Sequence, residues 1–308
     1  MANAATVAVQ SKHKNRIKTS RSDRVYYLIN NILLGIFFLI ILIPLINVVA
    51  CSFSDSFAVN SGQVFLWPVK FTLDGYKGVF TYPGIWRAYG NSFYYTIFGT
   101  VINLFMTLIA AYPLARRNLP GKGVVVALFM FTMLFSGGMI PGYLLIRDLH
   151  MINTVWSIVL PGAISVYNMI IARTFIQNIP VDLEEAAKID GCSDFRYFVS
   201  IVLPLSKAVI SVLMLYYAVG HWNDYMSALL YMNSDKKFPL QLMIRGLLTR
   251  AEMAQPDGMT EEQYQAMKNM ADLLRYSLII VSSVPVLVIY PFAKKYFMKG
   301  VMIGAVKG

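Results

Sequence analysis

The stretch that decides the fold reads Glu184-Glu185-Ala186-Ala187-Lys188-Ile189-Asp190-Gly191, and Ile201-Val202-Leu203-Pro204 follows it closely. It interrupts an otherwise apolar chain with charged residues. Asp182 and Glu185 have the spacing of a capping box, in which two side chains satisfy the free N–H groups at the start of a helix. The pattern therefore predicts that a helix begins here, capped by Asp182.

Small and turn-forming residues continue this stretch. Ala186 and Ala187 favour a helix and add little bulk, and Gly191 allows a backbone bend that other residues resist. Ser193 or Asp194 can cap a second short helix. We therefore expect a helix–turn–helix with a small-residue face, which the surface of another protein can approach closely.

The composition places this helix–turn–helix in a membrane protein. Of the 308 residues, 57% are hydrophobic and 14% are charged, whereas a soluble domain carries about 25% charged residues. Long runs without charge recur along the chain, and a membrane-spanning helix needs roughly 20 apolar residues. We expect an all-α membrane protein with six spans, at about 25–51, 88–115, 123–147, 151–178, 204–231 and 272–297.

The segments outside the spans are assigned by their charge and their position in the chain. The membrane domain is predicted at 25–300, after a basic tail at 1–24 and before a short tail at 301–308. The helix–turn–helix lies in a loop at 180–203, on the side of the two tails. The longest polar segment between spans, 232–271, is predicted on the opposite, outer side.

The net charge of +11 has two explanations, nucleic-acid binding or the excess of Lys and Arg that marks the cytoplasmic side of membrane proteins. With six spans and the N-terminus inside, the basic clusters all fall on the inner side. We therefore expect both termini in the cytoplasm, a basic tail attracted to anionic membrane lipid, and no nucleic-acid partner. The clusters comprise Lys12, Lys14, Arg16, Lys18, Arg21, Arg24, Arg116, Arg117, Lys122, Lys294, Lys295, Lys299 and Lys307.

No catalytic residue and no metal site are predicted. The three histidines, at 13, 150 and 221, are too dispersed to form a ligand set. Nucleophile–base pairs and phosphate-binding fingerprints are also missing from the sequence. The chain is therefore expected to bind no cofactor and to be a conduit that takes its energy from another protein.

The order Glu185-Ala186-Ala187, Gly191, Ile201 and Leu203-Pro204 is similar to the EAA loop of ABC importer permeases. Other segments resemble the carbohydrate-uptake branch of these permeases, and within it the oligosaccharide permeases of the lipoprotein-associated and alginate-importer type. These segments are Ser136-Gly137-Gly138-Met139-Ile140-Pro141, Gly220-His221-Trp222-Asn223 and the last ten residues from Lys299 to Gly308.

This resemblance implies a type I importer permease of the bacterial cytoplasmic membrane, paired with a second permease subunit. Two ATP-binding subunits that use ATP and Mg would bind below, and a solute-binding protein would dock above, against segment 232–271. The cargo would be an oligosaccharide or a uronic-acid-containing polysaccharide fragment such as alginate, imported by alternating access. The resemblance assigns ATPase coupling to Glu184, Glu185, Ala186, Ala187, Asp190, Gly191, Leu203 and Pro204.

Polar and aromatic residues within the predicted spans are candidates for the sugar path. Polar groups in a span usually face a cavity or a neighbouring helix, amides can bond sugar hydroxyls and aromatic rings can stack on a pyranose. The alternatives are hydrogen bonding between helices and, for Trp222, a place in the aromatic belt at the outer interface. The candidates are Asn103, Tyr167, Asn168, Trp222, Asn223 and Tyr225.

Two other classes of membrane protein remain as alternatives. A secondary transporter would need an ion or proton site within the membrane, and Asp224 is the only acidic residue in a hydrophobic run. A membrane-embedded enzyme would need clustered His or Asp residues at membrane depth, and the sequence has no such cluster. A permease for another small solute is a third alternative.

Overall fold

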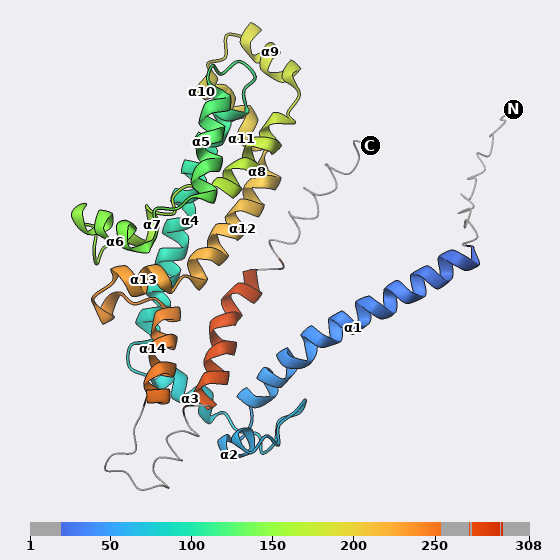
Figure 1. Cartoon of the computed structure of the whole chain (residues 1–308), viewed down its shortest axis with the longest axis vertical. Coiled ribbons are helices and arrows are strands. Elements are labelled where there is room, and N and C mark those ends of the chain that lie inside the picture. The colour runs from blue at the N-terminus through green and yellow to red at the C-terminus, as the bar shows by residue number, and fades with distance from the viewer. Residues whose placement is uncertain (1–19, 254–270, 272, 290, 292–308) are drawn as a thin grey trace, which may run out of the picture.

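The computed structural model describes residues 20–253, 271, 273–289 and 291, and every regular element within them is helical. The helices form an elongated bundle (Figure 1). The helix–turn–helix α9–α10 lies at one end of the bundle, and α13 and α14 lie toward the other. Residues 1–19 of the predicted basic tail at 1–24, the whole predicted tail at 301–308, and residues 254–270 of the outer segment are outside the described residues.

The first helix, α1 (Arg21–Ser52), stands apart from the bundle along most of its length (Figure 1). Its most apolar 18-residue window has a mean hydropathy of 3.0, and none of that window is buried within the chain. Only its end, at Ala50, Cys51 and Ser52, is buried. A bare apolar helix of this length is suited to lipid or to another membrane subunit.

Two short helices connect α1 to the bundle, α2 (Ser56–Asn60) and α3 (Asp74–Thr81). They lie at the end of the bundle that is far from α9 (Figure 1). The backbone N–H of Thr72 donates to the carbonyl of Phe53 at 3.0 Å, and the Tyr76 hydroxyl lies 2.8 Å from the Ser52 hydroxyl. This connecting segment is therefore folded onto the end of α1.

The central element is α4 (Ile85–Ala115), which runs along the bundle and packs against α8 and α12. Its buried face carries small and polar side chains spaced three or four residues apart, so they form one stripe. Small residues of this kind let helix backbones approach closely in a membrane. The stripe consists of Ser92, Thr96, Gly99, Thr100, Asn103 and Thr107.

The next two helices, α5 (Lys122–Leu134) and α6 (Met139–Asp148), meet at an angle of 112°. The residues Gly137-Gly138 and Pro141 favour either a bend or a close helix contact, and the break falls at the two glycines. Gly138 has a φ of +89°, a conformation that side chains other than hydrogen strongly disfavour. The predicted span 123–147 is therefore two helices, and α6 projects sideways from the bundle (Figure 1).

The predicted span 151–178 is also broken. Its residues form α7 (Val155–Val159) and α8 (Val166–Gln177), with irregular backbone between them. Pro161 lacks the N–H that a continuing helix needs, and Gly162 disfavours a helix interior. The break exposes backbone carbonyls inside the bundle, and one of them, at Gly162, accepts a hydrogen bond from α4.

After the helix–turn–helix, the chain re-enters the bundle through a series of short helical segments with a sharp bend. A π-helical turn at Phe198–Val202 precedes Pro204, which has no N–H to donate. The segment Asp194–Leu205 then meets α12 at an angle of 80°. The successive elements are α9 (Val181–Ile189), α10 (Asp194–Tyr197), the π-turn, α11 (Leu203–Leu205) and α12 (Lys207–Asn223).

The described part of the outer segment packs on the chain's own helices. Asn91 of α4 donates to the carbonyls of Lys236 and Phe238, at 2.9 and 3.0 Å. The backbone N–H of Leu240 donates to the Ser92 hydroxyl at 2.8 Å. The described part of the segment contains a 3-10 turn (Asp235–Lys237) and α14 (Leu240–Met253). Helix α13 (Met226–Tyr231) precedes the segment, and a last helix at Leu273–Ile289 follows it.

Two described helices, α1 and α4, are each long and apolar enough to cross a membrane. Two bent pairs, α5 with α6 and Asp194–Leu205 with α12, pass the same test only when each pair is taken as one span. The α7–α8 segment is divided, and the helix Leu273–Ile289 is shorter. The fold is an all-helical membrane fold, and the six crossings stay a prediction.

Candidate coupling loop and central cavity

The α9–α10 unit, residues 181–197, begins differently from the prediction. Helix α9 starts at Val181 with Pro180 in the capping position, and no side chain caps it. The predicted cap by Asp182 is wrong, because Asp182 already lies within the first helical turn. Its carboxylate, with that of Glu184, instead meets the positive end of the helix dipole.

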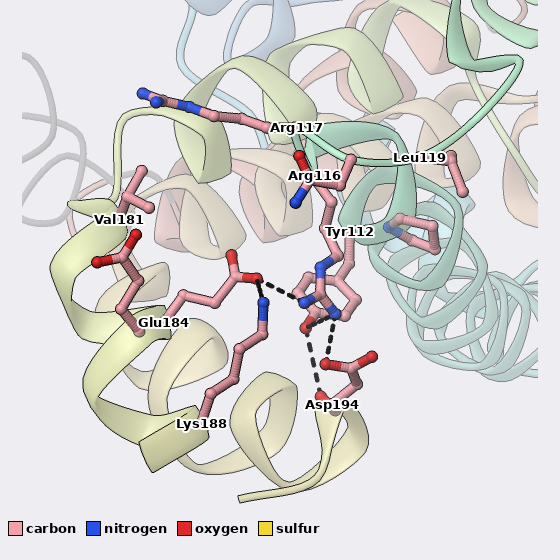
Figure 2. A pocket seen from close by; sticks show the side chains of 11 residues that line it. Tyr112, Arg116, Arg117, Leu119, Val181, Glu184, Lys188 and Asp194 are labelled. Atoms are coloured by element: carbon pink, nitrogen blue, oxygen red, sulfur yellow. Dashed lines mark hydrogen bonds and ion pairs between the residues drawn. The ribbon is translucent and has the colours of Figure 1, made fainter.

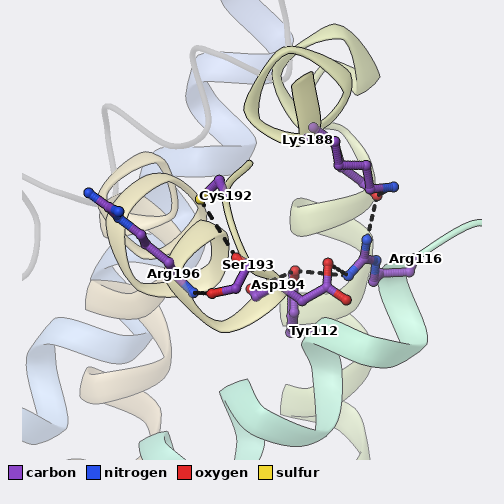
Figure 3. Close-up of polar contacts among 8 residues, drawn as sticks. Tyr112, Arg116, Lys188, Cys192, Ser193, Asp194 and Arg196 are labelled. Atoms are coloured by element: carbon purple, nitrogen blue, oxygen red, sulfur yellow. Dashed lines mark hydrogen bonds and ion pairs between the residues drawn. The ribbon is translucent and has the colours of Figure 1, made fainter. Parts of the chain in front are cut away.

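The bend and the second helix follow the prediction. Gly191 has a φ of +70°, so the turn uses the left-handed conformation that favours glycine. The Ser193 hydroxyl then caps α10 by accepting from the N–H of Arg196 at 3.4 Å (Figure 3). The motif therefore builds a rigid turn between two short helices.

The two alanines of the motif face different environments. Ala187 is only 8% exposed and belongs to the main hydrophobic core, together with Tyr197 and Phe198. Ala186 is exposed. The small-residue face predicted for a partner is therefore carried by Ala186, whereas Ala187 holds α9 against its own chain.

Three large apolar side chains of the unit are exposed. Ile189 is 86% exposed and Phe195 is 76% exposed, and Leu183 is also exposed. Large apolar side chains gathered on an exposed loop mark a protein contact surface. Glu185, Asp190 and Pro204 are exposed in the same region, and Leu203 is half-buried against the core.

The Glu184 carboxylate forms ion pairs with two cations of its own chain. Its Oε1 lies 2.5 Å from Nη2 of Arg116 and 2.7 Å from Nζ of Lys188 (Figure 2). The hydrogen bond from Lys188, and then that from Arg116, hold the pKa of the Glu184 carboxyl below its ordinary value, although burial opposes them. Glu184 therefore joins α9 to the end of α4, and Glu185 is the glutamate left free of such contacts among the described residues.

Arg116 was not singled out by the sequence as a site residue, although it is the first charge after a predicted span. It lies beside a groove of about 690 Å³ between the end of α4 and α9 (Figure 2). Its second guanidinium nitrogen, Nη1, lies 2.6 Å from Oδ1 of Asp194 on α10. The Tyr112 hydroxyl donates to the carbonyl of Asp194 at 3.3 Å (Figure 3). The end of α4 is thus bonded to both helices of the unit.

A second feature, called the central cavity below, is an open hollow of about 470 Å³ on the side of the bundle. It collects three of the six candidate path residues, Asn103, Asn168 and Asn223. These come from α4, α8 and α12, three helices that pack together. The cavity is also lined by Ile158, Pro161, Gly162, Ser165, Tyr216, Tyr217, Gly220, His221, Asp224 and Ser227.

Asn103 holds one wall of the central cavity. Its amide nitrogen donates to the carbonyl of Gly162 at 2.8 Å. Its Oδ1 lies 3.4 Å from Nε2 of His221, and because Oδ1 can only accept, the imidazole nitrogen carries the proton in this contact. Asn103 therefore both lines the cavity and makes a bond between helices, and its place in the sugar path stays a prediction.

The other three candidates do not line the central cavity. Trp222 is buried and donates from Nε1 to the carbonyl of Ser282 at 2.9 Å, so its side chain packs between helices. Tyr167 is exposed on α8. The Tyr225 ring makes a cation–π contact with the Arg245 guanidinium, whose Cζ lies 4.6 Å from the ring centroid.

Within residues 20–253 and the described part of the last helix, no three His, Cys, Asp or Glu side chains are grouped so that they could hold a metal ion. The chemistry that the described residues offer is hydrogen bonding to a polar solute in the central cavity, and attachment of a partner at the α9–α10 unit. Both features lie on helices that contact α4.

Comparison with known proteins agrees with this architecture. Protein LplC of Bacillus subtilis (strain 168) is 40% identical over 289 residues, which cover 94% of this chain and 97% of LplC. The polygalacturonan/rhamnogalacturonan transport system permease protein YtcP of the same organism is 41% identical over 272 residues, which cover 88% of this chain and 94% of YtcP.

A solved structure has the same fold. It is the crystal structure of a bacterial ABC transporter involved in the import of the acidic polysaccharide alginate, with a TM-score of 0.80 and 32% sequence identity. The match covers 91% of this chain and 99% of that one. Residues 81–301 match the family of binding-protein-dependent transport system inner membrane components. The chain belongs to this family, and it is a permease subunit of a transporter and not an enzyme.

Proposed function

We propose that this permease imports a uronic-acid-containing oligosaccharide, with the central cavity as its part of the path and the α9–α10 unit as the place where ATP-driven movement enters. The observation that carries the proposal is the presence in one chain of a polar cavity and a loop with exposed apolar side chains, joined through α4. The printed names of YtcP and of the alginate transporter, both for acidic polysaccharides, support this substrate class.

The central cavity has the chemistry of a site for hydroxyl-rich solutes. Three amides, with hydroxyl groups from serine and tyrosine, offer donors and acceptors in its lining. Its described lining includes no Lys or Arg. Arg245, which stacks on Tyr225 next to Asp224 of the cavity, is the cation best placed to meet a carboxylate near the outer end.

Energy enters from the cytoplasmic side in this proposal. The α9–α10 unit faces the cytoplasm together with both termini, as the distribution of Lys and Arg predicts. An ATP-binding subunit covers Ile189 and Phe195, whose exposure is costly unless a partner buries them. ATP and Mg are used by two such subunits, and a second permease completes the path.

A solute-binding protein delivers the sugar to the outer side. Segment 232–271 remains the proposed contact, because it is the longest polar segment between spans. Its described part, 232–253, is packed against α4, so residues beyond Met253 are the part proposed to reach the binding protein. The family's description as binding-protein-dependent supports this partner.

The test is uptake by proteoliposomes that contain this chain, its partner permease and the ATPase subunits, with binding protein added outside. We expect ATP-dependent uptake of labelled trigalacturonate that exceeds uptake of neutral arabinotriose, and no uptake with a non-hydrolysable ATP analogue. A preference for arabinotriose would contradict the substrate class. Uptake driven by an ion gradient without ATP would contradict the import mechanism and favour a secondary transporter.

A further inference from the structure

The C-terminal end of α4 is a junction to which several elements are bonded by cations. Nε of Arg173, on α8, donates to the carbonyl of Leu114 at 3.0 Å. Nζ of Lys122, at the start of α5, donates to the carbonyl of Arg116 at 2.9 Å. Positive charge at this end of a helix is stabilised by the helix dipole and satisfies carbonyls that have no partner in the helix.

Arg116 extends this junction to the α9–α10 unit. It is the first residue after α4, and its two terminal nitrogens pair with carboxylates on two different helices, Glu184 of α9 and Asp194 of α10. The Arg116 side chain is only 21% exposed, which reduces screening by water. One guanidinium therefore fixes both halves of the unit relative to α4.

The same helix reaches the central cavity. Asn103 lies 13 residues before Arg116 on α4, and at 1.5 Å per residue this corresponds to about 20 Å along the helix. The helix is continuous over this distance, although Pro113 in its last turn removes one backbone N–H, so a displacement at Arg116 is passed along α4 to Asn103. Asn103 in turn bonds the break between α7 and α8, and it contacts α12 through His221.

We infer that Arg116 is the positioning residue that joins the α9–α10 unit to α4, so that movement of the unit displaces α4 and with it the wall of the central cavity. This inference rests on the proposed function. Exposed single ion pairs contribute little to stability, about 0–1 kcal/mol. The pair of Arg116 with Glu184 differs because both side chains are mostly buried, at 21% and 25% exposed, whereas the Asp194 carboxylate, which is 69% exposed, adds a weaker second contact.

The neighbouring Arg117 provides a matched control. It has the same charge and lies beside the same groove, but its side chain points away from Glu184 and Asp194 (Figure 2). It makes no ion pair within the described residues. A variant at Arg117 therefore removes the same charge from the same surface and leaves the junction intact.

The experiment compares Arg116→Ala, Arg116→Lys and Arg117→Ala in the complete transporter with its binding protein. The readout is the number of ATP molecules hydrolysed per trigalacturonate imported, alongside the amount of ATPase that co-purifies. For Arg116→Ala we expect normal co-purification and a rise in this ratio of roughly five-fold or more, the range of an ordinary coupling free energy. Arg116→Lys, which keeps one arm, should be intermediate, and Arg117→Ala should match the wild type.

A double-mutant cycle with Asp194→Ala identifies the contact. If the pair acts as one unit, Asp194→Ala should raise the ratio in the wild type and have little further effect in Arg116→Ala. An unchanged ratio in Arg116→Ala, or an equal rise in Arg117→Ala, would overturn the inference. A loss of protein with an unchanged ratio in what remains would show a role in folding alone. A wild-type complex that imports only arabinotriose fails the substrate proposal instead, and the ratio is then measured with arabinotriose.

Discussion

The imidazole ring of His221 lies where a side chain at Gly99 would have to be placed. A methyl group built on Gly99 would be 2.4 Å from Nε2 of His221, and its other near contacts are atoms of the same ring. The close packing of α4 and α12 therefore depends on the missing side chain at this position. Because His221 also contacts Asn103, the same approach shapes the central cavity.

Adding a methyl group at this contact should weaken the fold. We expect Gly99→Ala to destabilise the purified transporter by about 1–3 kcal/mol, the usual cost of overpacking, measured as a lower free energy of unfolding in denaturant. Gly90→Ala, on the same helix with open space around it, is the control. It should be neutral or slightly stabilising, because Ala favours a helix. Equal effects of the two changes would contradict the described packing.

The cavity amides should act on transport and not on stability. Asn168→Leu and Asn223→Leu each remove a polar group from the central cavity, so uptake of trigalacturonate should need a higher concentration for half-maximal rate. Each lost hydrogen bond to a neutral group is worth about 0.5–1.5 kcal/mol, or roughly two- to twelve-fold in KM. Asn178→Leu, at the exposed end of α8, is the control. Wild-type KM values in both cavity variants would remove these residues from the path.

Trp222 should affect the stability of the protein and not the transport of the sugar. Its indole N–H bonds the carbonyl of Ser282 inside the bundle, so Trp222→Phe should cost about 0.5–1.5 kcal/mol of stability through the lost hydrogen bond. The KM for trigalacturonate should stay at the wild-type value. A changed KM with unchanged stability would return Trp222 to the sugar path.

The sequence predicts the helical membrane fold and the helix–turn–helix well, because both depend on local patterns. Charge-free runs set the approximate positions of the spans, and Gly191 specifies the turn through its own backbone conformation. The breaks at Gly137-Gly138 and Pro161-Gly162 likewise fall at residues that disfavour a helix interior. The start of α9 differs from the prediction because Pro180 takes the capping position without a side-chain cap, so the helix begins at Val181 and Asp182 lies inside it.

Long-range contacts could not be predicted from local patterns. Nothing near Arg116 in the sequence shows that two carboxylates, 68 and 78 positions further on, fold back to it. Likewise, the motif treats Ala186 and Ala187 alike, and only the packing of Tyr197 and Phe198 decides which of them is buried. For the same reason, the sequence could not show which three of the six candidate path residues line the cavity. That cavity forms only where three helices pack together.

The central claim is that the α9–α10 unit binds the ATP-hydrolysing partner, and its exposed apolar residues offer the most direct test. The measurement is the affinity of the purified ATPase for membranes that contain the two permeases, with Ile189→Ser and Phe195→Ser combined in this chain. If each side chain is a buried anchor worth about 2 kcal/mol, the affinity should fall by at least thirty-fold, roughly the effect of one anchor alone. Wild-type affinity in a variant that is correctly folded would contradict the account.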